Sequence, residues 1–135
     1  MDEKVIRDFL LENKINFQKN STILGTIKPD IGAYNNGLGK IMHIMRTHIL
    51  HFNSEGVAIV ALDDNSGKIL KDTLVFFKNK DIQIQIQIKI LSSLLTIHTE
   101  KGDMHYKIRK SAIGCPWHKE NFAYLLMRAT QNPKI

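Results

Sequence analysis

Histidine and cysteine are the side chains of this sequence that most often perform catalysis or bind metal ions. The chain has six histidines and one cysteine, Cys115, with His118 three positions further on. Nucleophilic catalysis by such a pair requires a base within hydrogen-bonding distance of the thiol and a third group that orients the base. Spacing alone supplies neither condition, so we interpret Cys115 as a turn residue that caps the helix expected from Pro116.

The other histidines lie in two regions where a metal site is conceivable. His43, His48 and His51 cluster in sequence, and strand pairing is expected to place His98 opposite His105. Stable zinc sites usually have three or four ligands, and neither a Cys-x-x-Cys pair nor a His-Glu-x-x-His motif accompanies these residues. We therefore expect a solvent-exposed histidine pair and no bound metal.

Carboxylates and glycines give no stronger catalytic pattern. Asp63 and Asp64 belong to an Asp-Asp-Asn-Ser-Gly segment, which is typical of a turn. Glycines within residues 32–40 precede Lys40, as in a phosphate-binding loop, but two required positions of that motif hold leucine and isoleucine. We expect no enzymatic activity and no cofactor.

The length and composition indicate a single domain. The chain has 135 residues, 43% apolar and 24% charged, and its lone cysteine cannot form an internal disulfide. Its acidic start does not match a signal peptide, and no apolar stretch approaches the roughly 20 residues of a membrane span. We predict a cytoplasmic protein. The formal net charge of +6 favours acidic partners.

Sequence periodicity predicts a mainly β protein with a helix at each end. Residues 2–14 predict an amphipathic helix with Val5, Ile6, Phe9 and Leu10 on its apolar face. Strands are expected at 22–27, 47–52, 57–62, 74–77, 82–90, 94–99 and 104–110. Short turns join most of these strands, which favours antiparallel pairing.

The strongest pattern is Ile-Gln-Ile-Gln-Ile-Gln-Ile-Lys-Ile at residues 82–90, where five isoleucines alternate with polar residues. Only a strand places alternate residues on opposite faces. The polar face carries Gln83, Gln85 and Gln87, with Lys89 as its single charge. Two interpretations remain open: a solvent-facing side of an interior strand, or an edge strand that pairs with another chain and so supports a homo-oligomer.

The last two strands are expected to form a hairpin. The predicted register places Thr99 opposite Met104 and His98 opposite His105. One face of the hairpin is then apolar, with Tyr106 pointing inward, and the other face is polar.

A final helix is predicted over residues 116–129, with Pro116 at the first position, where its missing N–H costs nothing. Its buried stripe is expected to comprise Phe122, Leu125, Leu126 and Ala129, and Trp117 is expected to anchor the start of the helix. Residues 1–21 then form an N-terminal helix and linker. Residues 22–135 form a β domain with its C-terminal helix, and the two parts make one compact domain.

Several segments of this order share a pattern with one known family. They are Arg-Thr-His-Ile-Leu-His-Phe at 46–52, Gly-Val-Ala-Ile at 56–59, the strand at 82–90, the hairpin within 94–108 and the terminal helix with Trp117. Over residues 22–129 the chain resembles the bacterial pleckstrin-homology-like (YokE-like) domains. The resemblance implies a strongly bent antiparallel sheet of about seven strands, nearly a barrel, with one end plugged by the C-terminal helix.

The resemblance also implies a binding function. In the superfamily the loop between the first two strands often carries basic residues that hold phosphoinositide headgroups; here that loop is 28–46, with Lys28, Lys40 and Arg46. The superfamily also serves widely as a protein-interaction scaffold. We therefore predict a non-catalytic binding module that contacts a protein partner or an anionic lipid surface.

The alternative is a small basic nucleic-acid-binding domain. Basic residues are expected near strand ends at Lys78, Lys80, Lys101, Lys107, Arg109 and Lys110. Aromatic side chains among them would allow bases to stack, but Tyr106 is expected to point inward. Nucleic acid is therefore the less favoured partner.

Overall fold

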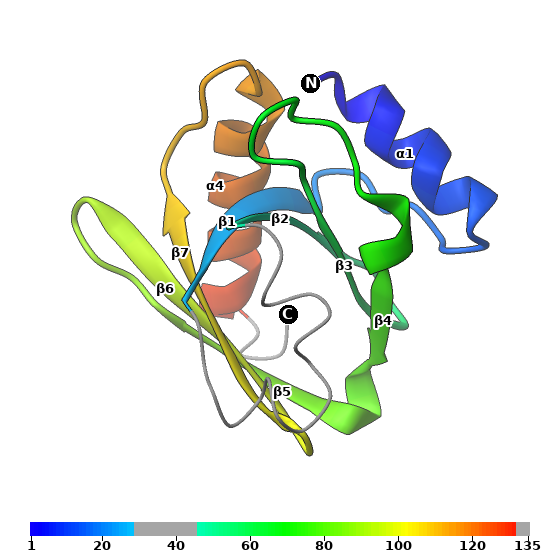
Figure 1. Cartoon of the computed structure of the whole chain (residues 1–135). Coiled ribbons are helices and arrows are strands. Elements are labelled where there is room, and N and C mark those ends of the chain that lie inside the picture. Colours follow the sequence, from blue (N-terminus) through cyan, green and yellow to red (C-terminus); the bar gives the residue numbers. More distant parts are fainter. Residues whose placement is uncertain (29–45, 132–135) are drawn as a thin grey trace.

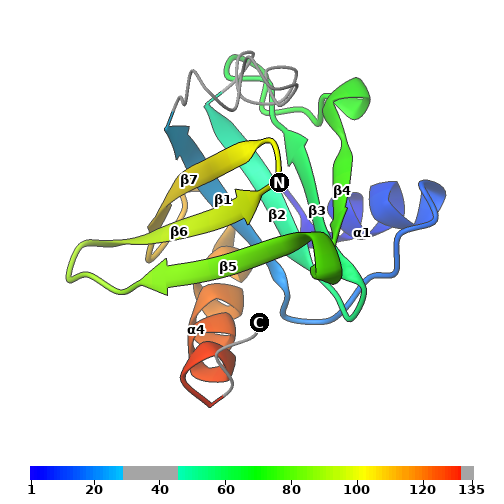
Figure 2. The same cartoon turned by 90° about the horizontal axis from the view of Figure 1, so that it is seen from below.

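In the part of the chain that the structure describes, seven antiparallel strands form one sheet in the order β4-β3-β2-β1-β7-β6-β5 (Figure 1). The strands are β1 (Thr22–Lys28), β2 (Thr47–Phe52), β3 (Gly56–Ala61), β4 (Val75–Lys78), β5 (Ile82–Gln87), β6 (Ser92–Thr99) and β7 (Gly102–Arg109). The computed structural model describes residues 1–28 and 46–131. Strands β5 to β7 cross strands β2 to β4 at a steep angle (Figure 2), so the sheet bends into a partial barrel. The predicted bent antiparallel sheet is confirmed.

Helices lie at both ends of the described chain: α1 (Glu3–Glu12) and α4 (Pro116–Gln131). Two short 3-10 turns, η2 (Lys71–Thr73) and η3 (Asn79–Asp81), flank β4. Helix α4 begins at Pro116 as predicted and packs against β1 across the end of the bent sheet. Among the described residues, no helix has both the length and the apolar character needed to cross a membrane.

The inner face of the bent sheet forms the main core. Its buried residues are Ile23, Ile27, Leu50, Phe52, Val57, Ile59, Leu95, Ile97, Met104, Tyr106, Ile108, Phe122 and Leu125. Alternate residues of each strand supply this core because a strand turns successive side chains to opposite faces. Tyr106 points inward and is fully buried, as predicted.

Helix α1 covers the outer face of strands β2 to β4 and forms a second core. Ile6, Phe9 and Leu10 pack there, whereas Val5, predicted for the same face, is 51% exposed. The buried stripe of α1 is therefore narrower than expected. Asp2 caps the helix, its carboxylate accepting the backbone N–H of Lys4 at 3.0 Å. Strand β3 is buried at every residue because side chains cover it on both faces.

The alternating segment forms a shorter strand than the sequence pattern predicts. β5 ends at Gln87, and its last pair with β6 joins Gln87 to Leu94. Residues 88–91 form the connection to β6, where Ile88 is 59% exposed and Ile90 is 85% exposed. The predicted alternation is confirmed up to Gln87. Ile88 and Ile90 lie beyond the end of the strand and are exposed to solvent.

The hairpin of β6 and β7 has the predicted faces but a register shifted by two residues. Thr99 lies opposite Gly102, and His98 lies opposite Asp103. The turn consists of Glu100 and Lys101 because Gly102 adopts a positive φ of 128° and lets the chain reverse one step earlier. A shift of two keeps every side chain on its face, so hydrophobic pattern alone cannot distinguish the two registers.

Candidate functional site

The basic residues predicted for the connection between β1 and β2 are described only in part. Lys28 ends β1, Arg46 precedes β2, and both are exposed. The N–H of Ile27 donates to the carbonyl oxygen of Arg46 at 2.9 Å, which joins these two strand ends. Lys40 and the glycine-containing segment 32–40 lie outside the described residues. The structure thus places two of the three predicted residues at one strand end.

Cys115 and His118 do not form a nucleophile and its base. His118 is buried, and both of its ring nitrogens bond to backbone: Leu24 N–H donates to Nδ1 at 3.0 Å, and Nε2–H donates to the Arg109 carbonyl at 2.7 Å. Burial lowers the pKa of His118. These bonds attach the start of α4 to β1 and β7, so His118 has a structural role.

The histidine pair predicted across the hairpin is not formed, because the register differs. His98 Nδ1 lies 2.9 Å from the carboxylate of Asp103, and His105 Nδ1 lies 2.9 Å from the hydroxyl of Thr96. Within residues 1–28 and 46–131, no group of three or more His, Cys, Asp or Glu side chains is arranged to hold a metal ion.

The histidines of β2 are buried on opposite faces of that strand. His48 Nδ1 lies 2.8 Å from the hydroxyl of Tyr106, whose pKa burial raises. His51 Nε2 accepts the backbone N–H of Gln18 at 3.0 Å, and Nδ1 lies 2.7 Å from the hydroxyl of Thr22. Each histidine thus serves a separate buried network, and they cannot share a metal ion. His43 lies outside the described residues.

Asp63 and Asp64 form the predicted turn. The carboxylate of Asp63 accepts the N–H groups of Asn65 and Ser66, each at 2.9 Å, and these bonds lower its pKa. Asp64 accepts the N–H of Arg46 at 3.3 Å. The carboxylate of Asp63 therefore orders backbone in the turn, and that of Asp64 joins the turn to the residue before β2.

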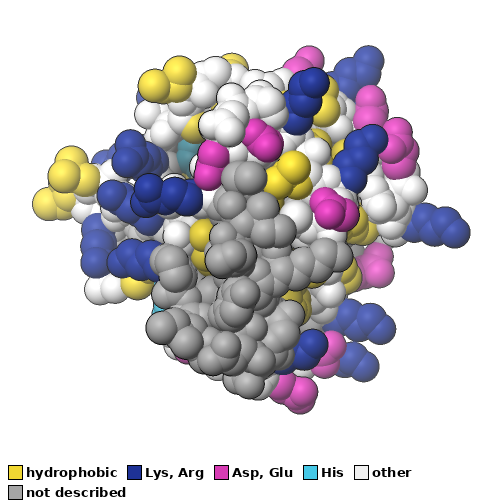
Figure 3. Space-filling view, in the orientation of Figure 1, with side chains coloured by type: hydrophobic (Ala, Val, Ile, Leu, Met, Phe, Trp, Pro, Cys, Tyr) yellow, Lys and Arg dark blue, Asp and Glu magenta, His cyan; other side chains and the backbone are white. Residues whose placement is uncertain are grey.

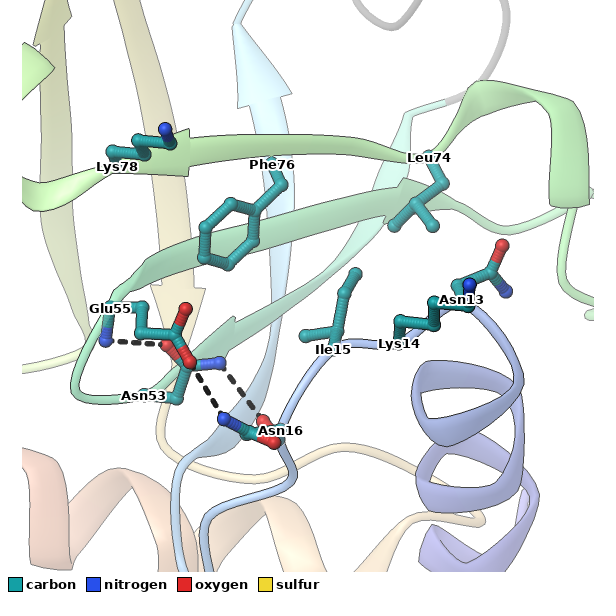
Figure 4. Close-up of a pocket in the computed structure, with 9 residues that line it drawn as sticks. All are labelled: Asn13, Lys14, Ile15, Asn16, Asn53, Glu55, Leu74, Phe76 and Lys78. Atoms are coloured by element: carbon teal, nitrogen blue, oxygen red, sulfur yellow. Dashed lines mark hydrogen bonds between the residues drawn. The ribbon is translucent and has the colours of Figure 1, made fainter.

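A hollow of about 430 Å³ lies between the end of α1, the β2–β3 turn and strand β4 (Figure 4). Three of its polar lining residues, Asn16, Asn53 and Glu55, bond to one another. The side-chain amide of Asn16 donates to Glu55 Oε1 at 2.6 Å, and the side-chain amide of Asn53 donates to the Asn16 carbonyl at 2.9 Å. We interpret this hollow as the joint that fixes the segment after α1 to the β2–β3 turn.

A different surface brings exposed apolar and basic side chains together. We call it the basic–apolar tip and define it by Ile90, Leu91, Ile113, Lys107, Arg109 and Lys110. The exposed fractions of Ile90, Leu91 and Ile113 are 85%, 87% and 105%. On the side of the molecule that carries the β5–β6 turn, apolar side chains project among lysine and arginine side chains (Figure 3).

Two connections position the tip: the β5–β6 turn and the segment between β7 and α4. They lie side by side because Ser92 pairs with Arg109. A hollow of about 450 Å³ there is lined by members of the tip and by serines, with no acidic side chain from the described residues. Lys28 extends the basic surface, since it lies opposite His105 on the sheet face that carries Lys107. The tip is therefore a positive surface that also carries exposed apolar side chains.

Sequence reasoning found the basic half of the tip and missed the apolar half. The alternation assigned Ile90 to a strand face, although β5 ends three residues earlier. The available signals were weak: Leu91 breaks the alternation, and Ile113 is an isolated large apolar residue between alanine and glycine.

The glutamine strand β5 is an edge strand. It is last in the sheet order, and within the described residues it pairs only with β6. Gln83, Gln85 and Gln87 are exposed. β5 is therefore not an interior strand, and its pairing with another chain stays a prediction.

The strand order and the capping helix define a mainly β domain of the α+β class, a bent antiparallel sheet closed by a C-terminal helix. Comparison with protein-family models, curated proteins and solved structures finds no match.

Proposed function

We propose that this chain is a non-catalytic binding module of the bacterial pleckstrin-homology-like family that docks on an anionic phospholipid surface in the cytoplasm. The observation that carries the proposal is the basic–apolar tip, where three almost fully exposed apolar side chains lie beside three basic ones. Large exposed apolar groups rimmed by polar residues commonly mark protein or membrane contact sites.

The two kinds of side chain would act on different layers of a membrane. Each lysine or arginine near an anionic surface contributes about 1 kcal/mol, and this contribution falls off within a Debye length. Transfer of a leucine or isoleucine side chain out of water contributes about 1.5–3 kcal/mol when burial is complete. Charge and apolar insertion together suit reversible docking that neither achieves alone.

Nucleic acid and protein are the competing partners. Nucleic acid would use the basic residues of the tip equally well, but it would gain little from exposed isoleucine and leucine side chains. Base stacking needs exposed aromatic rings, and Tyr106, beside Lys107 in sequence, is buried. A protein partner would require an acidic face around an apolar pocket. The lipid surface uses both halves of the tip.

Vesicle co-sedimentation tests the proposal. We expect the protein to pellet with vesicles of phosphatidylcholine and phosphatidylserine and to remain in the supernatant with phosphatidylcholine alone. The triple variant Lys107→Gln/Arg109→Gln/Lys110→Gln should weaken binding about 100-fold. The double variant Leu91→Ser/Ile113→Ser should weaken it about tenfold or more.

The matched control removes the same charge elsewhere, with Lys68→Gln/Lys71→Gln/Lys101→Gln, and should weaken binding far less than the tip variant does. Equal losses in the two triple variants, or equal binding to both kinds of vesicle, would refute tip docking. Retention of a DNA gel shift by Leu91→Ser/Ile113→Ser, with loss of that shift in the basic variant and no vesicle binding, would establish the nucleic-acid alternative instead.

A further inference from the structure

The outer edge of β5 has no backbone partner among the described residues. All of its residue pairs are with β6. The N–H and C=O groups of such an edge pair with a further strand unless charges, proline or a bulge prevent it. Residues 82–87 contain no charge and no proline, and their register with β6 is continuous. Nothing within the strand itself blocks pairing.

The other edge of the sheet is better protected. Strand β4 has four residues and ends at Lys78. The next residue, Asn79, is fixed to the β2–β3 turn: its backbone N–H donates to the Glu55 carbonyl and its side-chain amide to the Ser54 carbonyl, each at 3.0 Å. A further strand pairs poorly with an edge strand that is short, ends in a lysine and is held in place by hydrogen bonds at that end. β5 is thus the accessible edge.

We propose that two copies of this chain pair through β5, antiparallel, with the two-fold axis at Gln85. An interface between identical copies must be complementary to itself. Residues at equal distances before and after Gln85 are both isoleucine, both glutamine or oppositely charged. An antiparallel pair centred on Gln85 is therefore complementary to itself. The facing pairs are Gln83 with Gln87, Ile84 with Ile86, Ile82 with Ile88, and Asp81 with Lys89 of the second copy.

The flanking charges select this register. Asp81 lies four residues before Gln85 and Lys89 four residues after it, and both are exposed. Among the described residues neither takes part in an ion pair. Asp81 closes η3 and Lys89 lies in the connection after β5, so pairing centred on Gln85 brings each aspartate near a lysine of the second copy just beyond the two ends of the strand pair. A slip of two residues would leave these charges facing uncharged residues.

The apolar face of β5 packs against the main core but is only partly covered. Ile82, Ile84 and Ile86 are half-buried, and Ile88 is 59% exposed. A hollow of about 580 Å³ runs beside the strand, and its lining comprises Ile84, Gln85, Ile86 and Gln87 of β5, Leu94 and Thr96 of β6, and Ala129 of α4. The isoleucines of a second β5 would lie against this hollow. Pairing through β5 uses no residue of the basic–apolar tip. The proposed dimer therefore does not depend on the proposed docking to a membrane.

A cysteine scan tests the register. We expect Gln85→Cys to form a cross-linked dimer on mild oxidation, because directly opposite Cα atoms in an antiparallel pair lie about 4.5–5.5 Å apart, within disulfide range. Gln83→Cys and Gln87→Cys are matched controls on the same exposed face. Each position lies four residues, roughly 13 Å, from its own copy. Neither should cross-link alone, whereas the double variant should. Equal cross-linking at all three positions, or none at Gln85→Cys, would overturn the register.

Charge-reversal substitutions test the pairing without a cross-link. Sedimentation velocity should show a concentration-dependent dimer for the unmodified chain. Asp81→Lys and Lys89→Asp should each weaken dimerisation about tenfold, because each places like charges opposite one another. The double variant restores opposite charges at both ends and should restore the dimer. A chain that stays monomeric at every concentration, or a double variant no stronger than the single ones, would overturn the proposal.

Discussion

The substitution Gly56→Ala is expected to lower the free energy of unfolding by about 3 kcal/mol or more. Gly56 begins β3 opposite Lys78 of β4, and a Cβ added there would lie 1.9 Å from the carbonyl oxygen of Phe77. That oxygen belongs to the backbone, so it can move only if the two strands separate. Overpacking against side chains costs about 1–3 kcal/mol, and a backbone obstacle places this substitution at the upper end.

Urea denaturation followed by circular dichroism measures the effect. The matched control is Ser54→Ala, an exposed residue of the same turn, which should change the free energy of unfolding by less than about 0.5 kcal/mol. A loss smaller than about 1 kcal/mol for Gly56→Ala would mean that β3 and β4 do not approach as closely as the structure has them.

Lowering the pH from 6.5 to 4 is expected to remove about 3 kcal/mol of stability through His51. Burial lowers the pKa of His51 from 6.5 to about 4. The neutral ring fits its site because Nε2 accepts the N–H of Gln18, which leaves the proton on Nδ1, next to the Thr22 hydroxyl. Between these pH values the unfolded chain binds a proton that the folded chain does not. Stability is therefore fully present above pH 6.5 and falls as the pH decreases.

Urea denaturation at a series of pH values between 4 and 7 checks this slope. His118 adds to it in the same direction, since burial also lowers its pKa. The variant His51→Gln should unfold more easily at pH 7 but lose much of the slope. The control Ser54→Ala, which removes no titratable group, should leave the slope in place. An unchanged slope in His51→Gln would contradict the assignment.

These two effects concern a different part of the molecule from the proposed binding surfaces. Gly56 and His51 belong to strands β2 and β3, on which α1 packs. The basic–apolar tip and the outer edge of β5 belong to strands β5 to β7 and the connections beside them. Substitutions at separate sites with no shared partners usually act independently. Loss of vesicle binding or of dimerisation can thus be measured in variants that keep their stability.

Local patterns explain why most strands could be predicted. Alternation in 82–87 and in the hairpin strands reflects a sheet with one face on the core, a property that each strand carries in its own sequence. The continuous apolar run of β3 signals burial on both faces, which α1 provides. The start of α4 at Pro116 could also be predicted from the sequence, because the preference of proline for the first helical position is local.

Local sequence patterns could not predict the register of the final hairpin or the composition of the tip. Both depend on backbone conformation and on strand pairing between distant segments. Both hairpin registers give the same faces, and only the conformation of Gly102 selects one. Ile90 continues an alternating pattern in sequence, yet β5 ends before it because pairing with β6 ends at Gln87. Ile113 and Leu91 are more than twenty residues apart, and they meet only because Ser92 pairs with Arg109.

The sequence by itself determined which residues form strands, which face of each strand is apolar, and that a helix closes the chain. These properties follow from backbone geometry and side-chain alternation within a few residues. Only the tertiary structure decided that β5 lies at a sheet edge, that His118 bonds to two strands, and that basic and apolar side chains share one tip. Each of those facts depends on which distant segments pair, and periodicity within one segment carries no information about its neighbours.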